Sequence, residues 1–452
     1  MTISDAVVDK SGHSAATKAA LDTSHFWMPF TDNKAFKSNP RIFASAEGMH
    51  YTSSDGTRIL DATAGLWCVN AGHARREIAD AVTRQIANLD YAPTFQLGHP
   101  LPFELASRLA GIMPDGLDRI FFTNSGSESA DTALKMSLAY HRARGDTGRF
   151  RFVGRQRGYH GTNFGGTSVG GIGGNRSPFI TQLWGVDHLS HTQGNAVRFQ
   201  RGMQPGNEAL ADELESLIAL HGGETIAAVI VEPVAGSTGV LIPPQGYLQR
   251  LRDITSKHGI LLIFDEVITG FGRLGAATAA GHFGVTPDIL TMAKGLTNGA
   301  IPMGAVAART GIYDTVLDSV QSGIEFFHGY TYSGHPVASA AALATLKIYE
   351  DEGLFQRAAA LAPVWEDAVH SLHDAPHVAD IRNLGLVAGI ELAPREGAPG
   401  ARGTAAFQAA FESGLLIRTT GDIIAMSPPL IISEAQIEEI TGKLRAILET
   451  LR

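Results

Sequence analysis

The sequence predicts an α/β protein with a large domain on a mainly parallel, mixed sheet and a smaller α+β domain. Helical and strand-like segments alternate between residues 104 and 308, which is the pattern of βαβ units. Two continuous apolar runs, Ile226–Val231 and Ile260–Phe264, are typical of parallel strands buried on both faces. The 452 residues also exceed the size at which one hydrophobic core stops growing, about 250–300 residues.

The first 62 residues precede this alternating region. Residues 1–25 contain no apolar run typical of a signal peptide, and we expect a mobile tail there. Residues 26–62 hold short alternating segments with turn signals such as Asp55-Gly56. They predict a few small strands.

Between residues 74 and 308 the periodicity predicts helices and strands in turn. We expect helices at 74–89, 103–113, 127–144, 207–221 and 247–258, and strands at 119–123, 226–231, 260–264 and 303–308, with another beginning at 151–153. After Pro336 the alternation ends, and the pattern indicates a separate α+β layer. Its expected elements are helices at 337–350, 354–372, 404–413 and 434–451 and a strand at 387–392. Ser433 and Gln436 fit a capping box at the start of the last helix.

Charge and composition exclude several classes of protein. The formal charge is 36 − 45 = −9, which argues against a nucleic acid or an anionic membrane as partner. No apolar run reaches the ~20 residues needed to span a membrane. Cys68 is the only cysteine, so no intrachain disulfide can form. We therefore expect a reducing compartment, the cytoplasm.

A polar segment follows the predicted strand 119–123. Ser125 and Glu128 fit a capping box for the next helix. Gly126 lets the backbone come close to a ligand, and the first-turn N–H groups favour an anion. Alone, such a segment is more often an ordinary capped helix. The hydroxyl groups around Gly126, including that of Ser127, shift the expectation towards a phosphate site.

Three further residues have side chains that could bind the remaining parts of a ligand that carries this phosphate. Asp265 follows the strand 260–264, at the edge where open α/β sheets bind ligands, and a buried carboxylate there needs a cationic or hydrogen-bonding partner. Tyr159, between glycines, can offer an aromatic face to a ring. Lys294 follows an apolar segment and can lose its proton and attack a carbonyl. Taken singly, Tyr159 is more often a packed loop residue and Lys294 a surface lysine. Together with the phosphate site they predict pyridoxal phosphate.

The other motifs in the sequence do not indicate a further type of active site. Gly166-Thr-Ser-Val-Gly170 matches the G-x-S-x-G pattern, but the surrounding glycines make the required helix implausible, and we reject a serine hydrolase. A dinucleotide motif is incomplete because Arg176 stands at its last glycine position. His188 and His191 lack an accompanying carboxylate pattern and are expected to be loop residues, so no metal site is predicted.

Several segments in a fixed order resemble one known family. They extend from about Trp27 to the C-terminus and include HFWMPFT, AGLWCVNAGH, FFTNSGSESADTALK, RGYHG, VEPVAGSTGVLIPPQGYL, LLIFDEVITGFGR, AKGLTNGAIPMGAV and HGYTYSGHPV. The sequence resembles the class III pyridoxal-phosphate aminotransferases, and within them the ω-amino acid–pyruvate (β-alanine–pyruvate) transaminases. The resemblance implies fold type I and a homodimer with active sites at the subunit interface, with a tetramer left open. It also implies a large cofactor domain at residues 63–335 and a small domain formed by residues 26–62 and 336–452.

The resemblance further implies which residues bind the cofactor. Lys294 would hold it as a Schiff base, and Asp265 would pair with the pyridine nitrogen. Tyr159 and Val267 would contact the two faces of the ring. The remaining implied cofactor-binding residues are Ser125, Gly126, Ser127, His160, Glu232 and Thr331 of the partner subunit.

Substrate residues are implied in the same way. Arg418 would bind the carboxylate of a keto acid, for which a guanidinium is well suited. Relatives that use 2-oxoglutarate tend to carry a glutamate in the loop after Glu232-Pro233. Here that loop reads Ala235-Gly236-Ser237, without an acid, which favours pyruvate. The implied substrate residues are Phe26, Leu66, Trp67, Tyr159, Ile268 and Arg418.

The implied reaction moves an amino group from an ω-amino acid or primary amine to pyruvate. It gives an aldehyde or ketone and L-alanine by a ping-pong mechanism, with Lys294 transferring the proton and Asp265 keeping the ring nitrogen protonated. The alternatives are a 2-oxoglutarate-dependent aminotransferase, a dialkylglycine decarboxylase, an aminomutase, or a protein of the same fold that only binds. The physiological amine and the stereopreference stay open.

Overall fold

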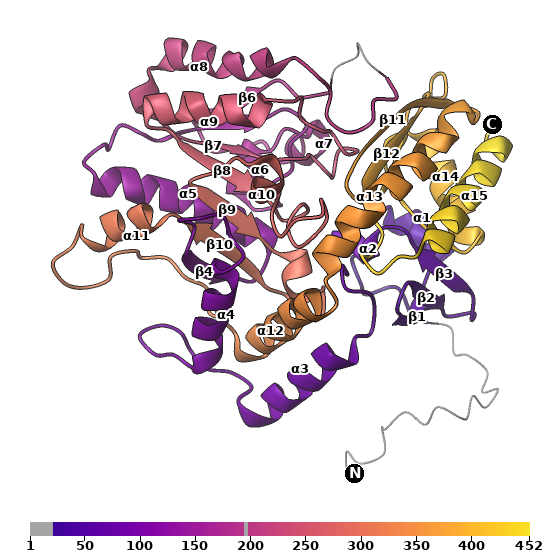
Figure 1. The fold of residues 1–452 in the computed structure, drawn as a ribbon, viewed down its shortest axis with the longest axis horizontal. Helices are drawn as coiled ribbons and strands as arrows, with labels where there is room; N and C mark the ends of the chain where they lie inside the picture. The colour runs from indigo at the N-terminus through magenta and orange to yellow at the C-terminus, as the bar shows by residue number, and fades with distance from the viewer. Residues whose placement is uncertain (1–20, 194–197) are drawn as a thin grey trace.

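The structure is a computed structural model that describes residues 21–193 and 198–452 (Figure 1). Residues 1–20 of the predicted tail lie outside the described residues. Figure 1 shows a large sheet on one side of the molecule and two smaller sheets on the other, next to the C-terminal helices. Within the described ranges, no helix combines the length and apolarity that crossing a membrane requires.

The large sheet has seven strands in the order β4-β10-β9-β8-β7-β5-β6. Only β10 runs antiparallel to its neighbours, so the sheet is the mainly parallel, mixed sheet that the sequence predicts. Its strands are β4 (Arg119–Thr123), β5 (Arg151–Arg155), β6 (Val186–Leu189), β7 (Ile226–Val231), β8 (Leu261–Asp265), β9 (Ile289–Met292) and β10 (Gly304–Ala308).

Both faces of this sheet are buried, which explains the continuous apolar runs. Ile230 and Ile263 pack into one hydrophobic cluster together with Leu134 of helix α5 (Gly126–Ala143). Their neighbours Val229 and Leu262 pack into the other cluster, on the opposite face. Because successive side chains alternate between faces, a strand covered on both sides needs an apolar residue at every position.

Two four-stranded sheets lie beside the large one. The first has the order β1-β2-β3-β13 and the second β11-β12-β15-β14. In the first sheet, β13 pairs in parallel with β3, so segments from both ends of the chain meet there. The domain boundaries stay a prediction. The strands are β1 (Phe43–Glu47), β2 (His50–Ser53), β3 (Arg58–Asp61), β11 (Val378–Leu384), β12 (Val387–Leu392), β13 (Leu415–Leu416), β14 (Arg418–Thr420) and β15 (Ile423–Met426).

The helices agree with most of the predicted ranges, and the capping box of Ser433 and Gln436 is present at α15. One predicted helix, 207–221, is instead a 3-10 turn followed by a shorter helix. The α-helices are α1 (Asn33–Ser38), α2 (Ala64–Trp67), α3 (Arg76–Asn88), α4 (Pro100–Ala110), α5 (Gly126–Ala143), α6 (Phe164–Val169), α7 (Gly173–Arg176), α8 (Glu213–His221), α9 (Tyr247–His258), α10 (Ala279–Phe283), α11 (Thr310–Leu317), α12 (Pro336–Asp351), α13 (Leu354–His370), α14 (Ala401–Glu412) and α15 (Glu434–Thr450). The 3-10 turns are η1 (Glu208–Asp212), η2 (Gly223–Thr225), η3 (Lys294–Thr297) and η4 (Ser371–Asp374).

Candidate active site

A cavity of about 190 Å³ lies at the carboxyl ends of the parallel strands. This is the edge at which open α/β sheets place their ligands. The segments that line it follow β4, β5, β7, β8 and β9, so residues far apart in the sequence meet at one place. The lining residues are Gly126, Ser127, Tyr159, His160, Gly161, Glu232, Asp265, Val267, Ile268, Ala293 and Lys294.

Asp265, the last residue of β8, is buried and accepts two hydrogen bonds. Its Oδ2 lies 2.8 Å from Nδ1 of His160, and its Oδ1 accepts the backbone N–H of Val267 at 3.1 Å. His160 is buried as well, and its Nε2 has no partner among the described residues. The pair fixes the orientation of the carboxylate at the cavity wall.

Glu232 holds two loops of the cavity together. Its Oε1 accepts the N–H of Tyr159 at 2.8 Å, and its Oε2 accepts the N–H of Gly236 at 3.1 Å. Burial raises the pKa of Glu232, and the nearby charge of His160 opposes this shift. We infer that Glu232 sets the position of the Tyr159 ring relative to the strand ends.

The start of α5 has the features of an anion site. Ser125 Oγ accepts the N–H of Glu128 at 3.2 Å. The predicted capping box is only half formed, because the Glu128 carboxylate accepts the N–H of Asn124 rather than that of Ser125. In the described part of the chain, the N–H groups of Gly126 and Ser127 have no acceptor, which leaves them available to a ligand.

Glycines keep this wall close-packed. A Cβ at Gly126 would lie 2.9 Å from Val267 Cγ1, and one at Gly161 would lie 2.4 Å from Ser127 Oγ. Neither position has room for a larger residue. The cavity therefore presents backbone rather than side chain to a ligand at this point.

Lys294 begins η3, two residues after the last residue of β9, and its φ of +49° is unusual for a residue other than glycine. Its Nζ has no hydrogen-bond partner among the residues that the structure describes. Burial lowers the pKa of Lys294, whereas the charges of Cys68, Asp265 and Glu232 raise it. An amine with a lowered pKa in a cavity can act as a nucleophile and as a proton carrier.

Several predicted site residues do not line this cavity in the single chain. Phe26 and Leu66 are 65% and 51% exposed, and Thr331 is exposed with its carbonyl accepting from Tyr91 Oη at 3.0 Å. Trp67 is buried and belongs to the same apolar cluster as Ile268, which does line the cavity. Their predicted roles stay predictions.

Arg418 lies on β14, partly buried, and its guanidinium makes no ion pair or hydrogen bond with any described residue. Burial lowers the pKa of Arg418, and the charge of Tyr159 opposes this shift. Thr420 of the same strand donates to the carbonyl of Ser237 at 2.8 Å, which joins β14 to the loop after Glu232. A partly buried guanidinium without a carboxylate partner is suited to an anionic ligand.

The rejected motifs have structural roles. Residues 164–169 form the short helix α6 despite their glycines, whereas the helix that a nucleophile elbow requires directly after the motif is absent, because the backbone at Gly170 is extended. Ser168 lies inside this helix, donates to the carbonyl of Phe164 at 2.6 Å and accepts from Leu183 N at 2.8 Å, so it is not a nucleophile elbow. His188 is on strand β6 rather than in a loop and bonds to Gly170 O at 2.9 Å. Among the described residues, no cluster of three or more potential metal ligands occurs.

Glu266, next to Asp265, faces away from the cavity. Its carboxylate accepts the N–H groups of Ala279 and Ala280 at the start of α10, and burial raises its pKa to about 7. The folded state therefore binds more protons than the unfolded state between about pH 4.5 and 7, and stability falls as the pH rises through this window. At ~1.4 kcal/mol per pKa unit the loss is up to about 3 kcal/mol.

The Glu266→Gln side chain cannot titrate, so the free energy of unfolding of this variant lacks the pH-dependent contribution of Glu266. We expect the melting temperature of the wild type, relative to that of the variant, to fall by a few degrees between pH 5 and 8. Thermal unfolding followed by circular dichroism at both pH values measures this. A pH-independent difference would show that the pKa of Glu266 is not raised.

The fold and this site define an aminotransferase. Residues 33–448 match the model of the family Aminotransferase class-III, and the chain belongs to this family. It is 62% identical to an omega-aminotransferase of Caulobacter vibrioides over 430 residues, covering 95% of this chain and 98% of that protein. It is 51% identical to the β-alanine–pyruvate aminotransferase of Pseudomonas aeruginosa, covering 94% of this chain and 95% of the relative.

Solved structures agree with this assignment. An (S)-enantioselective omega-transaminase from Thermomicrobium roseum is similar with a TM-score of 0.88 and 37% identity, over 94% of this chain and 96% of that one. The omega-transaminase of Pseudomonas jessenii, solved in complex with PMP, gives a TM-score of 0.89 and 34% identity, over the same shares. The chain therefore has the type I fold of this family, as predicted.

Proposed function

We propose that this protein is a pyridoxal-phosphate-dependent ω-transaminase that moves an amino group from an ω-amino acid or primary amine to pyruvate. The observation that carries the proposal is the partly buried amine of Lys294, without a partner among the described residues, in the same cavity as Asp265 and the free N–H groups of α5. The names of the relatives from Caulobacter and Pseudomonas support the substrate class.

The residues present fit pyridoxal phosphate. The N–H groups of Gly126 and Ser127 have no other acceptor in the described chain and suit a phosphate, with Ser125 fixing the helix start. Asp265 is a carboxylate that suits a protonated ring nitrogen. When bound, the cofactor supplies an aldehyde that takes up amino groups and a ring that accepts negative charge.

The chain's own residues would then hold the cofactor, transfer the proton and orient the reacting groups. Lys294 would hold the cofactor, and as a free amine it would move a proton from the substrate carbon. Tyr159 and Val267 enclose the ring, and His160 and Glu232 fix Asp265 and the Tyr159 loop. The products are an aldehyde or ketone and L-alanine, by ping-pong kinetics.

The protein is further proposed to act as a homodimer in the cytoplasm, with a tetramer left open. Phe26 and Thr331, both exposed in the single chain, are the residues whose predicted roles depend most on this arrangement. In it, Thr331 of the partner subunit reaches the phosphate. Size-exclusion chromatography with light scattering tests the oligomeric state.

The acceptor is proposed to be pyruvate because the loop Ala235-Gly236-Ser237, which contacts β14 next to Arg418, carries no acid. Arg418→Ala is expected to lower kcat/KM for pyruvate by about 10- to 100-fold, since a charge-assisted bidentate contact is lost. For an amine donor without a carboxylate, kcat/KM should change by less than about threefold. Arg418→Lys keeps the charge without the fork and should give an intermediate value; equal losses for both substrates would contradict this role.

A panel of amine donors against pyruvate and 2-oxoglutarate, with product identification, tests the function. We expect a yellow preparation that bleaches with (S)-1-phenylethylamine and regains its colour with pyruvate. Release of CO₂ would indicate a decarboxylase, and migration of the amine within one molecule an aminomutase. A preparation without any colour change would support a protein that only binds.

A further inference from the structure

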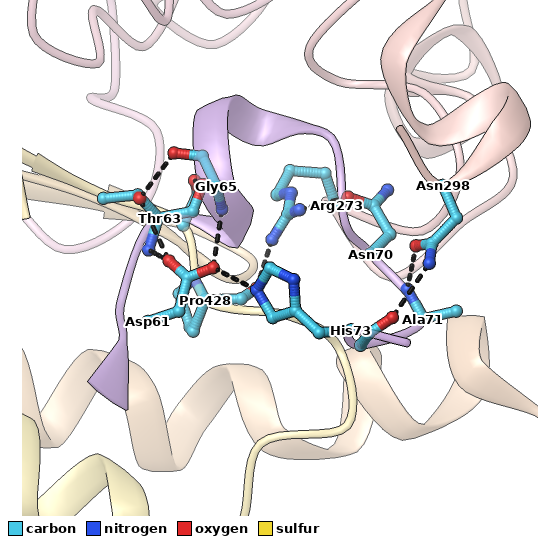
Figure 2. Close-up of polar contacts among 11 residues, drawn as sticks. Asp61, Thr63, Gly65, Asn70, Ala71, His73, Arg273, Asn298 and Pro428 are labelled. Carbon is cyan, nitrogen blue, oxygen red and sulfur yellow. Dashed lines mark hydrogen bonds and ion pairs between the residues drawn. The ribbon is translucent and has the colours of Figure 1, made fainter. Parts of the chain in front are cut away.

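A buried polar network holds the turn Ala64–Trp67, as Figure 2 shows. Its anchor is Asp61, the last residue of β3, which is fully buried. Oδ1 of Asp61 accepts the N–H of Thr63 at 2.8 Å. Oδ2 accepts the N–H of Gly65 at 2.6 Å and lies 2.8 Å from Nε2 of His73, which is also buried.

The turn itself has a strained backbone. Ala64, Gly65 and Trp67 have φ values of +48°, +68° and +63°, in the region that residues other than glycine avoid. Such a backbone persists only where its surroundings over-determine it. Asp61 meets this condition because it accepts two N–H groups within four residues, and His73 is a further hydrogen-bonding partner of the buried carboxylate.

The network extends from this turn to the end of η3, the 3-10 turn that contains Lys294. Asn298 Oδ1 accepts the N–H of Ala71 at 2.8 Å, and its Nδ2 donates to the carbonyl of Gly72 at 2.9 Å. Asn298 follows η3, the 3-10 turn that begins at Lys294, and it has a φ of +53°. In Figure 2 the contacts run from Asp61 on one side, past His73, to Asn298 on the other.

Arg273 secures the middle of the same segment. It is fully buried and donates to Asn70 Oδ1 and to the carbonyl of Pro428. Asn70 in turn donates to the carbonyl of Phe271 at 2.9 Å. The stretch from Asp61 to His73 is thus fixed to three other parts of the chain, which leaves its turn little freedom.

This turn carries Leu66 and Trp67, two of the predicted substrate residues, beside the cavity rather than in its lining. Trp67 is 2% exposed and shares an apolar cluster with Ile268, a lining residue of the cavity. Leu66, its neighbour, is 51% exposed and is available to a ligand. A shift of the turn would therefore move both side chains relative to Ile268.

We propose that Asp61 and His73 are positioning residues that set the amine preference by holding Leu66 and Trp67 in place. The inference rests on the proposed function. An amine without a carboxylate is fixed by apolar walls alone, whereas Arg418 holds the carboxylate of the keto acid. Loosening the turn therefore impairs the use of apolar amines more than the use of pyruvate.

Asp61→Asn tests this in the holoenzyme, because the amide keeps the shape but cannot accept from both Thr63 and Gly65 as before. We expect kcat/KM for (S)-1-phenylethylamine to fall about tenfold and that for pyruvate to change less than about threefold. Amide hydrogen exchange in the peptide spanning residues 62–73 should become about tenfold faster. This second readout does not depend on activity.

Asp288→Asn is the matched control. Asp288 is also a buried carboxylate that accepts a backbone N–H, from Leu262 at 2.7 Å, and pairs with Arg252 at 2.8 Å, but it lies outside the network. This control should alter neither the ratio of the two kcat/KM values nor exchange at residues 62–73. The proposal is wrong if Asp61→Asn and Asp288→Asn both lower kcat/KM for the amine and for pyruvate by one common factor. It is also wrong if amide exchange at residues 62–73 is unchanged in Asp61→Asn.

A second pair of variants covers the case in which Asp61→Asn does not fold. His73→Gln keeps a donor for Asp61, and His73→Leu removes it. We expect His73→Gln to keep the wild-type amine preference and exchange rate. We expect His73→Leu to lose the amine preference and to exchange faster at residues 62–73. Identical behaviour of the two variants would overturn the proposal. If the wild type transaminates no amine, the proposed function fails, while the exchange measurements still decide whether Asp61 and His73 hold the turn.

Discussion

Replacing Lys294 by alanine is expected to lower the rate of amino-group transfer by at least about 10⁴-fold. Lys294 supplies the amine in the cavity, and its Nζ is held by no other described residue. The proposed reaction uses that amine twice, to hold the cofactor and to carry the proton. Asp265 and Glu232, the nearby carboxylates, cannot replace it because both are engaged by hydrogen bonds.

The measurement is the formation of alanine from pyruvate and an amine donor, in steady state and in a single turnover. Lys347→Ala serves as control, since Lys347 is a surface lysine on α12 that pairs with Asp351 at 2.9 Å. We expect this control to transaminate at the wild-type rate. A Lys294→Ala enzyme that transaminates at a near-native rate would show that the proposed mechanism is wrong.

Local periodicity accounts for the parts of the fold that the sequence predicts well. The strand Ile226–Val231 and the helix Tyr247–His258 have the predicted bounds, because each carries a strong pattern of its own. Strands β6 and β11 and the short strands β13–β15 were not predicted. Strands β13, β14 and β15 have two to four residues each, which is too few for an alternating apolar pattern. Such a strand forms because a partner strand pairs with it, as β15 does with β14.

The same distinction applies to the site. Most of the predicted cofactor residues line one cavity, because most of them follow strands whose patterns are recognisable. The Asp61 network escaped prediction, since Arg273 and Asn70 are 203 residues apart and no spacing relates them. A glycine in the sequence would suggest a positive φ value. Ala64 and Trp67 have positive φ values, but their residue types give no such indication. Such positioning contacts appear only once the chain is folded.

The two neighbouring acids at the end of β8 allow a direct test of which charge acts in the reaction. Asp265→Asn is expected to lower kcat by at least about 100-fold, the usual cost of removing one electrostatic group from an active site. The amide oxygen can still accept from the N–H of Val267, and the NH2 group can donate to Nδ1 of His160 in the tautomer that carries its proton on Nε2, so both contacts can be kept. What is lost is the negative charge, which raises the proton affinity of a nearby ring nitrogen by about 1–3 pKa units.

Glu266→Gln makes the same chemical change one residue further along. Its side chain contacts the start of α10 rather than the cavity, so we expect kcat within about threefold of the wild type, despite the altered stability. Both variants are assayed under saturating amine and pyruvate, with the content of bound cofactor measured by absorbance. Similar losses in the two would mean that any charge near β8 matters only to the fold. A loss confined to Asp265→Asn assigns the effect to the carboxylate that lines the cavity.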